Sequence, residues 1–401
     1  MNIEEILDSK YQMTDGGRVC TIRDLYTTFS PNVDIEALKA SDFFPALNQM
    51  MEPVLGVPDE RSPEVLAYWA KRGMVKEFHG YDVPMDWNQY AEETGYRWKA
   101  EKFDIKQNEH KIWTSFVPAS AFRPENKGRK YPVVFALHGA TNDIFLVDGW
   151  GFAQEAAKRE WIVIVPSIEL HDILAEILEE AKRLYPVDDS RVYVTGFSYG
   201  GWSSNRLGNQ RPDIFAAVGP CGAAIDNSCN EGVDDDCEPI PPFDGKPRAL
   251  ELDTYMPVIN VYGNCDGERF PFYNFRGKKF SLSKLETPAD LIGGINTWAR
   301  VNHAPEIKVE DVMALKDRTD LSDAERDIGL PLTPDCRRSF VADGVQYHIA
   351  DLKSDDGITR VRIVAEINIP HWPTPEMIRL IFEFFSHFSR NPVTKASIYH
   401  E

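Results

Sequence analysis

The chain has 401 residues, of which 43% are hydrophobic and 27% are charged. It is long enough for one large α/β domain with additions, or for two domains. Lysine and arginine total 44 against 63 for aspartate and glutamate, and the net charge of −19 excludes nucleic acid and anionic membrane surfaces as expected partners.

Residues 1–95 are predicted to form an N-terminal helical extension. Apolar spacing favours helices at Ile3–Tyr11, Asp34–Met51 and Pro63–Arg72. The segment Met1–Lys10 is acidic and lacks the basic start and apolar core of a signal peptide. No apolar run approaches the roughly 20 residues of a membrane span. A cytoplasmic location is therefore expected.

From residue 96 to residue 401, strand and helix patterns alternate. The runs Tyr96–Ile105 and Lys111–Pro118 are predicted to pair as a hairpin. The later strands are apolar throughout, which is typical of strands covered on both faces of a parallel sheet. The predicted fold class is α/β, with a doubly wound, mostly parallel sheet. We expect strands at Val133–Leu137, Trp161–Val165, Arg191–Thr195, Phe215–Val218, Val258–Tyr262 and Val361–Ile367, and helices at Trp150–Arg159, Leu174–Tyr185, Trp202–Gln210 and Pro375–Phe388.

A G-x-S-x-G pentapeptide spans Gly196–Gly200, with Ser198 at its centre. By itself this pattern is weak, because glycine is common. Here a predicted strand precedes it and a predicted helix follows it, and that context is the one that a nucleophile elbow requires. Ser198 is therefore the candidate nucleophile, and it needs a base to take its proton.

In this architecture the base and its orienting acid follow the serine in the order acid, then histidine. His371 is the candidate base, because it lies just after the last predicted strand in a loop held by prolines. Asp266 is the candidate acid, because it follows the end of the strand Val258–Tyr262, and Glu268 is the alternative. The acid would accept the Nδ1 hydrogen of His371 and fix its tautomer.

The oxyanion of an acyl-transfer intermediate needs backbone N–H donors. The Tyr199 amide is expected to supply one, and the loop after Leu137 the other, from Ala140 with Thr141 as the alternate. Thr141, Trp202 and Trp372 are also candidates for contact with the substrate. Further aromatic side chains near the expected mouth are Phe270, Phe272 and Tyr273.

Several motifs together resemble one group of enzymes: L-H-G-A at Leu137–Ala140, V-D-D-S-R-V-Y-V-T-G-F-S-Y-G-G at Val187–Gly201, P-D-I-F-A-A-V at Pro212–Val218, Y-G-N-C-D at Tyr262–Asp266 and H-W-P at His371–Pro373. They are similar to the α/β-hydrolase serine esterases grouped with polyhydroxybutyrate depolymerases, feruloyl esterases and acetylxylan esterases. The resemblance covers roughly residues 110–270 and 345–390. It implies a triad of Ser198, Asp266 and His371, a catalytic domain over 96–401, and ester hydrolysis with no cofactor.

Two features depart from that group. Pro370 precedes the histidine where the group usually has glycine. The stretch between Asp266 and His371 is also far longer than a strand-to-helix connection needs. Residues from about 280 to 340 are therefore expected to form a lid-like insertion, with helices at Pro288–Val301 and Val309–Lys316, that helps to select the substrate.

The cysteines do not indicate a metal site, because no C-x-x-C pair occurs. Cys229 and Cys237 flank an acidic loop and are expected to be free thiols in a reducing compartment, although an exported protein would allow a bridge between them. The aspartates between them lack the spacing of a calcium loop.

The sequence thus predicts a serine hydrolase that cleaves small or medium carboxylic esters through an acyl-enzyme. The alternative is a serine peptidase of the prolyl oligopeptidase type, which shares the elbow and the order of the triad. A non-catalytic binding module is disfavoured by the intact triad residues. The expected partner is a small-molecule ester, and a homo-oligomer is left open.

Overall fold

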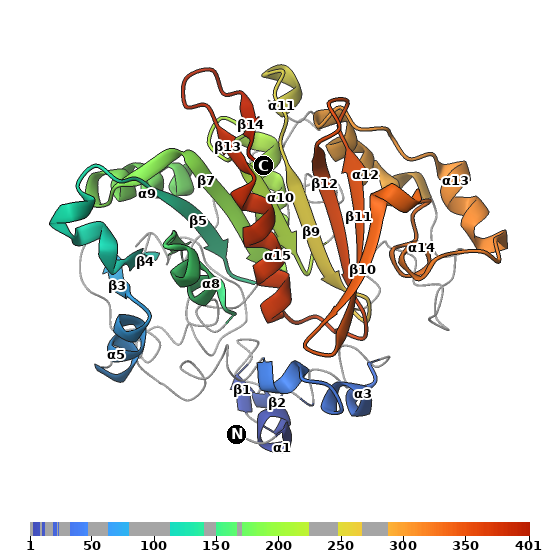
Figure 1. Ribbon diagram of the computed structural model, residues 1–401, viewed down its shortest axis with the longest axis horizontal. Helices are drawn as coiled ribbons and strands as arrows, with labels where there is room; N and C mark the ends of the chain where they lie inside the picture. Colours follow the sequence, from blue (N-terminus) through green and yellow to red (C-terminus); the bar gives the residue numbers. More distant parts are fainter. Residues whose placement is uncertain are drawn as a thin grey trace.

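The computed structural model describes residues 3–8, 10–12, 19–21, 23, 33–46, 63–79, 113–139, 150–166, 171–223, 248–266 and 288–401 (Figure 1). Within these residues the main sheet is 10-stranded, in the order β10-β11-β12-β9-β8-β7-β5-β6-β4-β3. The middle strands from β12 to β6 run parallel, and antiparallel strands flank them on both sides. The bounds are β3 (Met74–His79), β4 (Trp113–Pro118), β5 (Tyr131–Leu137), β6 (Ile162–Pro166), β7 (Val187–Phe197), β8 (Ala217–Cys221), β9 (Val258–Gly263), β10 (Arg337–Ala342), β11 (Val345–Lys353) and β12 (Thr359–Glu366).

Helices cover both faces of this sheet (Figure 1). α8 and α15 lie in front of it in the view shown, and α9, α10 and α12 lie behind it. Strand β5 is buried along its whole length, with Val134 and Ala136 in one apolar core and Val133, Phe135 and Leu137 in the other. The helices are α1 (Ile3–Leu7), α3 (Ile35–Lys39), α5 (Pro63–Lys71), α8 (Phe152–Arg159), α9 (His171–Leu184), α10 (Tyr199–Gln210), α11 (Arg248–Glu251), α12 (Pro288–Val301), α13 (Val309–Ala314), α14 (Asp323–Ile328) and α15 (Pro375–Ser386).

The predicted fold class is confirmed: the sheet is mostly parallel and doubly wound, and its central strands are those expected from the apolar runs. Two small antiparallel pairs lie outside the main sheet: β1 (Lys10–Gln12) with β2 (Val19–Thr21), and β13 (Phe388–Arg390) with β14 (Ser397–Tyr399). No described helix is long and apolar enough to cross a membrane.

The N-terminal segment is less helical than predicted. β3 belongs to the main sheet, because Gly73 ends α5 with a φ of 70° and the chain then pairs along β4. β3 and β6 are the two neighbours of β4 among the described residues, and the predicted hairpin partner Tyr96–Ile105 lies outside them. Residues 74–79 thus supply an edge strand of the main sheet.

Two predicted N-terminal helices are also shorter than expected. The helix predicted at Ile3–Tyr11 ends at Leu7, and Lys10 and Tyr11 lie in β1. The helix predicted at Asp34–Met51 breaks after Lys39, because the Ser41 hydroxyl donates to Leu38 O and accepts from Phe43 N. Such local bonds from serine compete with the helical ladder.

The segment predicted as an insertion, 280–340, is described from residue 288 onward. α12 is the crossover helix between the parallel neighbours β9 and β12, so it belongs to the α/β framework rather than to an addition. The Trp298 indole of α12 donates to Asn205 of α10 over 2.8 Å, which fixes α12 on the back of the sheet. The addition itself contains α13, α14 and the β10–β11 hairpin, which widens the sheet beyond β12.

The first described part of the N-terminal segment, with α1, β1, β2 and α3, lies at the carboxyl edge of the parallel strands, at the bottom of the view (Figure 1). The Asp34 N–H donates to Asn368 Oδ1 over 2.6 Å, and Asn368 Nδ2 donates to Asp34 O over 2.8 Å. Ser41 packs against Gly344 in the β10–β11 turn so closely that no side chain fits there. Ligands of open α/β sheets bind at this edge, so the N-terminal segment borders the region where a site is expected.

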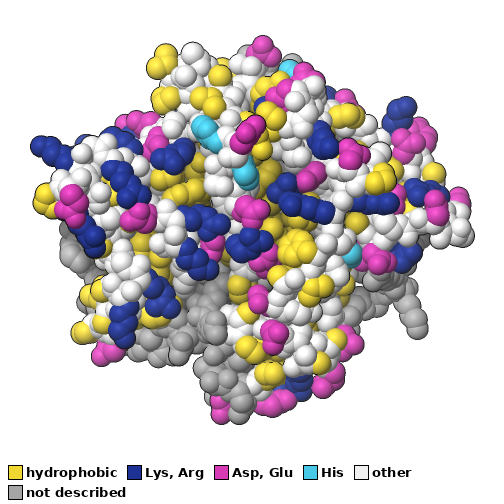
Figure 2. All heavy atoms as spheres, viewed as in Figure 1, with side chains coloured by type: hydrophobic (Ala, Val, Ile, Leu, Met, Phe, Trp, Pro, Cys, Tyr) yellow, Lys and Arg dark blue, Asp and Glu magenta, His cyan; other side chains and the backbone are white. Residues whose placement is uncertain are grey.

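The surface above α15 carries charges of both signs (Figure 2). Arg379 of α15 pairs with Glu376 over 2.5 Å, and Arg362 of β12 pairs with Asp351 over 2.6 Å. Among the described residues of this face, lysine and arginine side chains are interspersed with acidic side chains.

A buried carboxyl group joins β12 to α15. Glu366 is the last residue of β12 and is fully buried. The Thr374 hydroxyl donates to Glu366 Oε1 and accepts from Met377 N over 3.0 Å, so it also caps α15. Burial is the main cause that raises the pKa of Glu366, to about 8. Glu366 is thus a neutral group at pH 7 that closes the loop between β12 and α15.

The raised pKa of Glu366 predicts a pH dependence of stability. Its contribution is complete below the usual glutamate pKa near 4.5 and is lost as the pH rises through about 8, because the folded state must then either keep the proton or bury a charge. Glu366→Gln keeps the acceptor but cannot ionise. We expect the melting temperature of this variant, relative to wild type, to rise between pH 5 and pH 9. Glu383→Gln, at a half-buried carboxylate of α15 that pairs with Arg379, is the control and should show no such rise. If the difference in melting temperature between Glu366→Gln and wild type stays constant from pH 5 to pH 9, the raised pKa of Glu366 is contradicted.

Candidate active site

Ser198 occupies a sharp turn between β7 and α10. Its backbone has φ 58° and ψ −116°, a conformation that costs free energy for a residue with a side chain. The turn is held by two backbone bonds: Ser198 N donates to Cys221 O over 2.9 Å, and Ser198 O accepts from Trp202 N over 3.1 Å. This strand, strained serine and helix are the nucleophile elbow that the pentapeptide predicted.

The glycines around Ser198 are required by close backbone packing. A Cβ on Gly196 would lie 2.6 Å from the Gly200 carbonyl carbon, and one on Gly200 would lie 2.6 Å from His138 O. A Cβ on Gly201 would lie 2.5 Å from Cys221 O. The elbow therefore packs directly against the backbone at the ends of β5 and β8, and only glycine lets the backbones come this close.

The predicted acid and base lie in direct contact. His371 Nδ1 is 2.6 Å from Asp266 Oδ2. Asp266 is 8% exposed and His371 is 35% exposed, so a buried carboxylate orients a solvent-accessible ring. A carboxylate only accepts, so Nδ1 carries the proton and Nε2 is left as the free base. The imidazole also packs on Phe197, the residue before Ser198, with 4.6 Å between ring centroids.

The loop that carries Asp266 and the loop that carries His371 are joined by their backbones. Cys265 N donates to Ile369 O over 2.9 Å, and a Cβ on Gly263 would lie 2.6 Å from Pro370 O. Asn264 Oδ1 accepts from Asn368 N over 2.7 Å. The two loops therefore form one unit, and main-chain contacts together with the Asn264 side chain fix the separation between Asp266 and His371.

Asn368 extends this unit to the N-terminal segment. Its φ of 65° lies in the left-handed region, which asparagine tolerates better than most residues. Its side chain makes the reciprocal pair of bonds with the backbone of Asp34. Sequence reasoning did not single out Asn264 or Asn368. Asn264 stood inside the quoted Y-G-N-C-D motif, but nothing near Asn368 in the sequence identifies its partner.

The predicted oxyanion donors are only partly described. Tyr199 is the first residue of α10 and directly follows Ser198, so its N–H lies in the first turn of the helix, beside the elbow. Ala140 and Thr141 lie outside the described residues. His138 and Gly139, which precede them, are described, and His138 Nδ1 lies 2.9 Å from Gly139 O. The contact of Gly200 with His138 O brings the start of that loop to the elbow.

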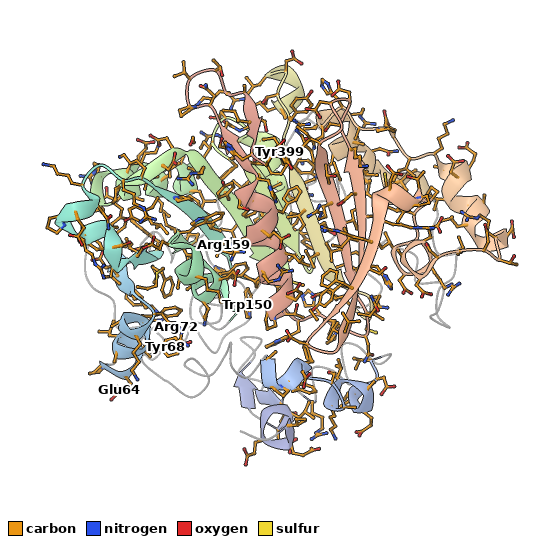
Figure 3. All side chains as sticks on the ribbon, viewed as in Figure 1. Glu64, Tyr68, Arg72, Trp150, Arg159 and Tyr399 are labelled. Atoms are coloured by element: carbon orange, nitrogen blue, oxygen red, sulfur yellow. The ribbon has the colours of Figure 1, made fainter. Side chains whose placement is uncertain are left out.

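The predicted substrate-contacting tryptophans differ in exposure. Trp202 lies in the first turn of α10, one turn beyond Ser198, and is half-buried. Trp372 is buried in the same apolar core as α15, and its contact with a substrate stays a prediction. Trp150, at the base of α8, also supports the elbow, with its ring 5.2 Å from that of Phe197 in an edge-on contact (Figure 3). Glu268, Phe270, Phe272 and Tyr273 lie outside the described residues.

Cys221, Cys265 and Cys336 are free thiols. Cys265 adjoins Asp266, and burial, followed by the charge of Asp266, raises the pKa of its thiol to about 11. It is therefore a neutral thiol beside the candidate site. Cys229 and Cys237 lie outside the described residues. Among the described part of the chain, no cluster of three or more histidine, cysteine, aspartate or glutamate side chains could hold a metal ion.

The chain is similar in sequence to several known proteins. A model of the prolyl oligopeptidase family matches residues 165–236, which include the elbow. Feruloyl esterase B of Piromyces equi is 26% identical over 165 residues, covering 41% of this chain and 28% of that protein. Poly(3-hydroxyalkanoate) depolymerase C of Paucimonas lemoignei is 25% identical over 119 residues, covering 24% of this chain and 29% of that protein. The chain thus spans less than a third of the length of either relative.

Among solved structures, the acylaminoacyl peptidase of Pyrococcus horikoshii is similar at 12% identity with a TM-score of 0.41, covering 84% of this chain and 44% of that one. That likeness is too distant to bear on activity. The strand order and the elbow already establish the fold. The chain therefore has the α/β-hydrolase fold, and the sequence relatives that it matches include a feruloyl esterase and a depolymerase.

Proposed function

We propose that this protein is a serine hydrolase that cleaves carboxylic esters through an acyl-enzyme. The observation that carries the proposal is the 2.6 Å contact between Asp266 and His371, with the His371 ring against Phe197 beside the strained Ser198. These are the parts that activate a serine hydroxyl: a nucleophile held clear of the backbone, a base, and a buried acid that fixes the base.

In the proposed reaction, His371 Nε2 takes the proton of Ser198 as Oγ attacks the ester carbonyl. The imidazolium that forms is stabilised by Asp266. The oxyanion is held by the Tyr199 N–H and by a second N–H, which we assign to Ala140, with Thr141 as the alternate. His371 then returns the proton to the leaving alcohol, and water hydrolyses the acyl-enzyme by the same route. These steps use no cofactor.

We further propose a small or medium ester as the substrate, with the N-terminal segment bordering the mouth. The bonds between Asp34 and Asn368 support this placement, because Asn368 lies three residues before His371. The described part of the 280–340 insertion packs behind the sheet and at its outer edge, so the N-terminal segment is the better supported cover. Free thiols among the described cysteines support the proposal of a cytoplasmic location.

A second candidate function is that of a serine peptidase. The match of the prolyl oligopeptidase family model over residues 165–236 favours it. The same triad would serve, since amide and ester hydrolysis share the acyl-enzyme. Turnover of aryl esters against turnover of proline amides by the purified protein separates the two functions.

Ser198→Ala should abolish ester hydrolysis and leave the fold intact. We expect a loss on the order of 10⁴-fold or more in kcat/KM for an aryl acetate, because the triad members act as a unit. The thermal melt should stay close to that of wild type or rise, since alanine removes the catalytic hydroxyl but keeps the side-chain volume small. More than a tenth of wild-type turnover would refute Ser198 as the nucleophile.

Asp266→Asn should be far more damaging than Glu268→Gln. Asparagine keeps the size of the side chain at Asp266 but no longer stabilises the imidazolium or selects the productive tautomer, for which the reference loss in kcat is about 10⁴-fold. Glu268→Gln tests the alternative acid with the same change of charge. Steady-state kinetics of both variants decide the assignment, and a larger loss in Glu268→Gln would transfer the role of the acid to Glu268.

We expect Asn368 to affect kcat indirectly, by holding the loop that positions His371. Asn368→Gly keeps the left-handed backbone but removes both side-chain bonds to Asp34. We expect kcat to fall roughly tenfold, the effect of about 1.4 kcal/mol, with a smaller change in KM. Asp34→Asn is the matched control, because it leaves the bonded backbone groups in place and keeps an N-cap for α3. An unchanged kcat in Asn368→Gly would show that the anchor does not position the base.

A further inference from the structure

A second serine, histidine and aspartate array lies outside the candidate active site. Ser339 of β10 stands directly opposite His348 of β11. Ser339 Oγ is 2.7 Å from His348 Nδ1, and His348 Nε2 is 3.0 Å from Asp327 Oδ2 of α14. The His348 side chain is 3% exposed and that of Asp327 is 0% exposed, whereas Ser339 is exposed on the outermost strand of the main sheet.

The direction of the proton in this array follows from the chemistry of its members. The Asp327 carboxylate lies 3.0 Å from Nε2 and can only accept, so its negative charge favours the tautomer of His348 with the hydrogen on Nε2. In a neutral imidazole, Nδ1 then carries a lone pair, and the Ser339 hydroxyl donates to it. A hydroxyl hydrogen-bonded to a neutral imidazole that a buried carboxylate orients is the arrangement of an activated serine. In His371 the nitrogen that faces the carboxylate is Nδ1, whereas in His348 it is Nε2.

The scaffold holds these groups in a fixed geometry. On β11, Tyr347 and Ile349 enter the core on the α15 side, so the alternate residue His348 faces α14. α14 begins with a capping box in which Ser322 and Glu325 satisfy each other. Arg337, two residues before Ser339 on the same face of β10, donates to Ser322 Oγ over 2.6 Å and also pairs with Glu325. Arg337 thus ties β10 to the start of α14 beside the array.

We propose that Ser339 is a second nucleophilic serine, independent of Ser198, that accepts an acyl group from activated esters and a phosphonyl group from fluorophosphonates. In acylation, a bond forms between Ser339 Oγ and the carbonyl carbon, and the bond from that carbon to the leaving oxygen breaks. The hydroxyl proton passes to His348 Nδ1 and then to the leaving oxygen, which gives an ester on Ser339 and a free alcohol. With a fluorophosphonate, fluoride leaves phosphorus and the proton departs with it as HF.

The test removes the first nucleophile and looks for the second. The full chain carrying Ser198→Ala is treated with an alkyl fluorophosphonate, and the adduct is located by peptide mass spectrometry. We expect phosphonylation at Ser339, at a rate about 100-fold above that at Ser386, an α15 serine whose hydroxyl donates to a backbone carbonyl and has no imidazole partner. Adding Ser339→Ala should remove the adduct. No adduct at Ser339, or a rate equal to that at Ser386, would overturn the proposal.

The role of His348 is tested in the same background. His348→Gln retains a donor toward Asp327 but removes the base, so a folded variant should label at Ser339 about 100-fold more slowly. Circular dichroism melts establish whether the variant folds. If the variant does not fold, the ratio of the phosphonylation rates at Ser339 and Ser386 in the Ser198→Ala protein is sufficient to test the proposal. Unchanged labelling in a folded His348→Gln protein would show that the array only satisfies buried polar groups, and the proposal would fail.

Discussion

The close approach of three backbone segments at the elbow is the constraint on which the rest of the site depends. The ends of β5 and β8 pack against the turn at Gly196, Gly200 and Gly201, where any Cβ would overlap main-chain atoms. This packing, together with the bond from Ser198 N to Cys221 O, holds Ser198 at a positive φ. The strained backbone is therefore sustained by the surrounding sheet and not by the turn residues themselves.

The pairing of β9 with β12 sets the other half of the site. Because these strands are parallel neighbours, the loops that follow them leave the same edge of the sheet, and Asp266 meets His371 there. The long connection between them leaves this pairing intact, since α12 returns the chain across the back of the sheet and the β10–β11 hairpin is added beyond β12. Glu366 and Asn368 then tie the histidine loop to α15 and to the N-terminal segment.

The two serine arrays illustrate different ways to place a hydroxyl beside an imidazole. Ser198 depends on a strained turn at the end of a strand, next to first-turn N–H groups of α10 that are suited to an oxyanion. Ser339 depends only on strand register, which sets it opposite His348 in unstrained extended backbone. The proposed site at Ser198 thus combines activation with stabilisation of developing charge, whereas the array at Ser339 offers activation of the hydroxyl alone, which favours a single transfer over rapid turnover.

The sequence by itself determined the central strands, the elbow and the residue types of the proposed triad. Continuous apolar runs specify strands that are buried on both faces, and glycines at fixed offsets from Ser198 specify a tight turn, so both signals are local. Only the tertiary structure decided that Met74–His79 completes the sheet, that Trp372 is a core residue, and that Asp34 pairs with Asn368. These three features depend on which distant segment pairs with a strand edge or hydrogen-bonds to a backbone group. Short segments that are polar or of mixed composition have no local sequence pattern that identifies their pairing partner. The partner is selected by the free energy of contacts that form only after the sheet is assembled.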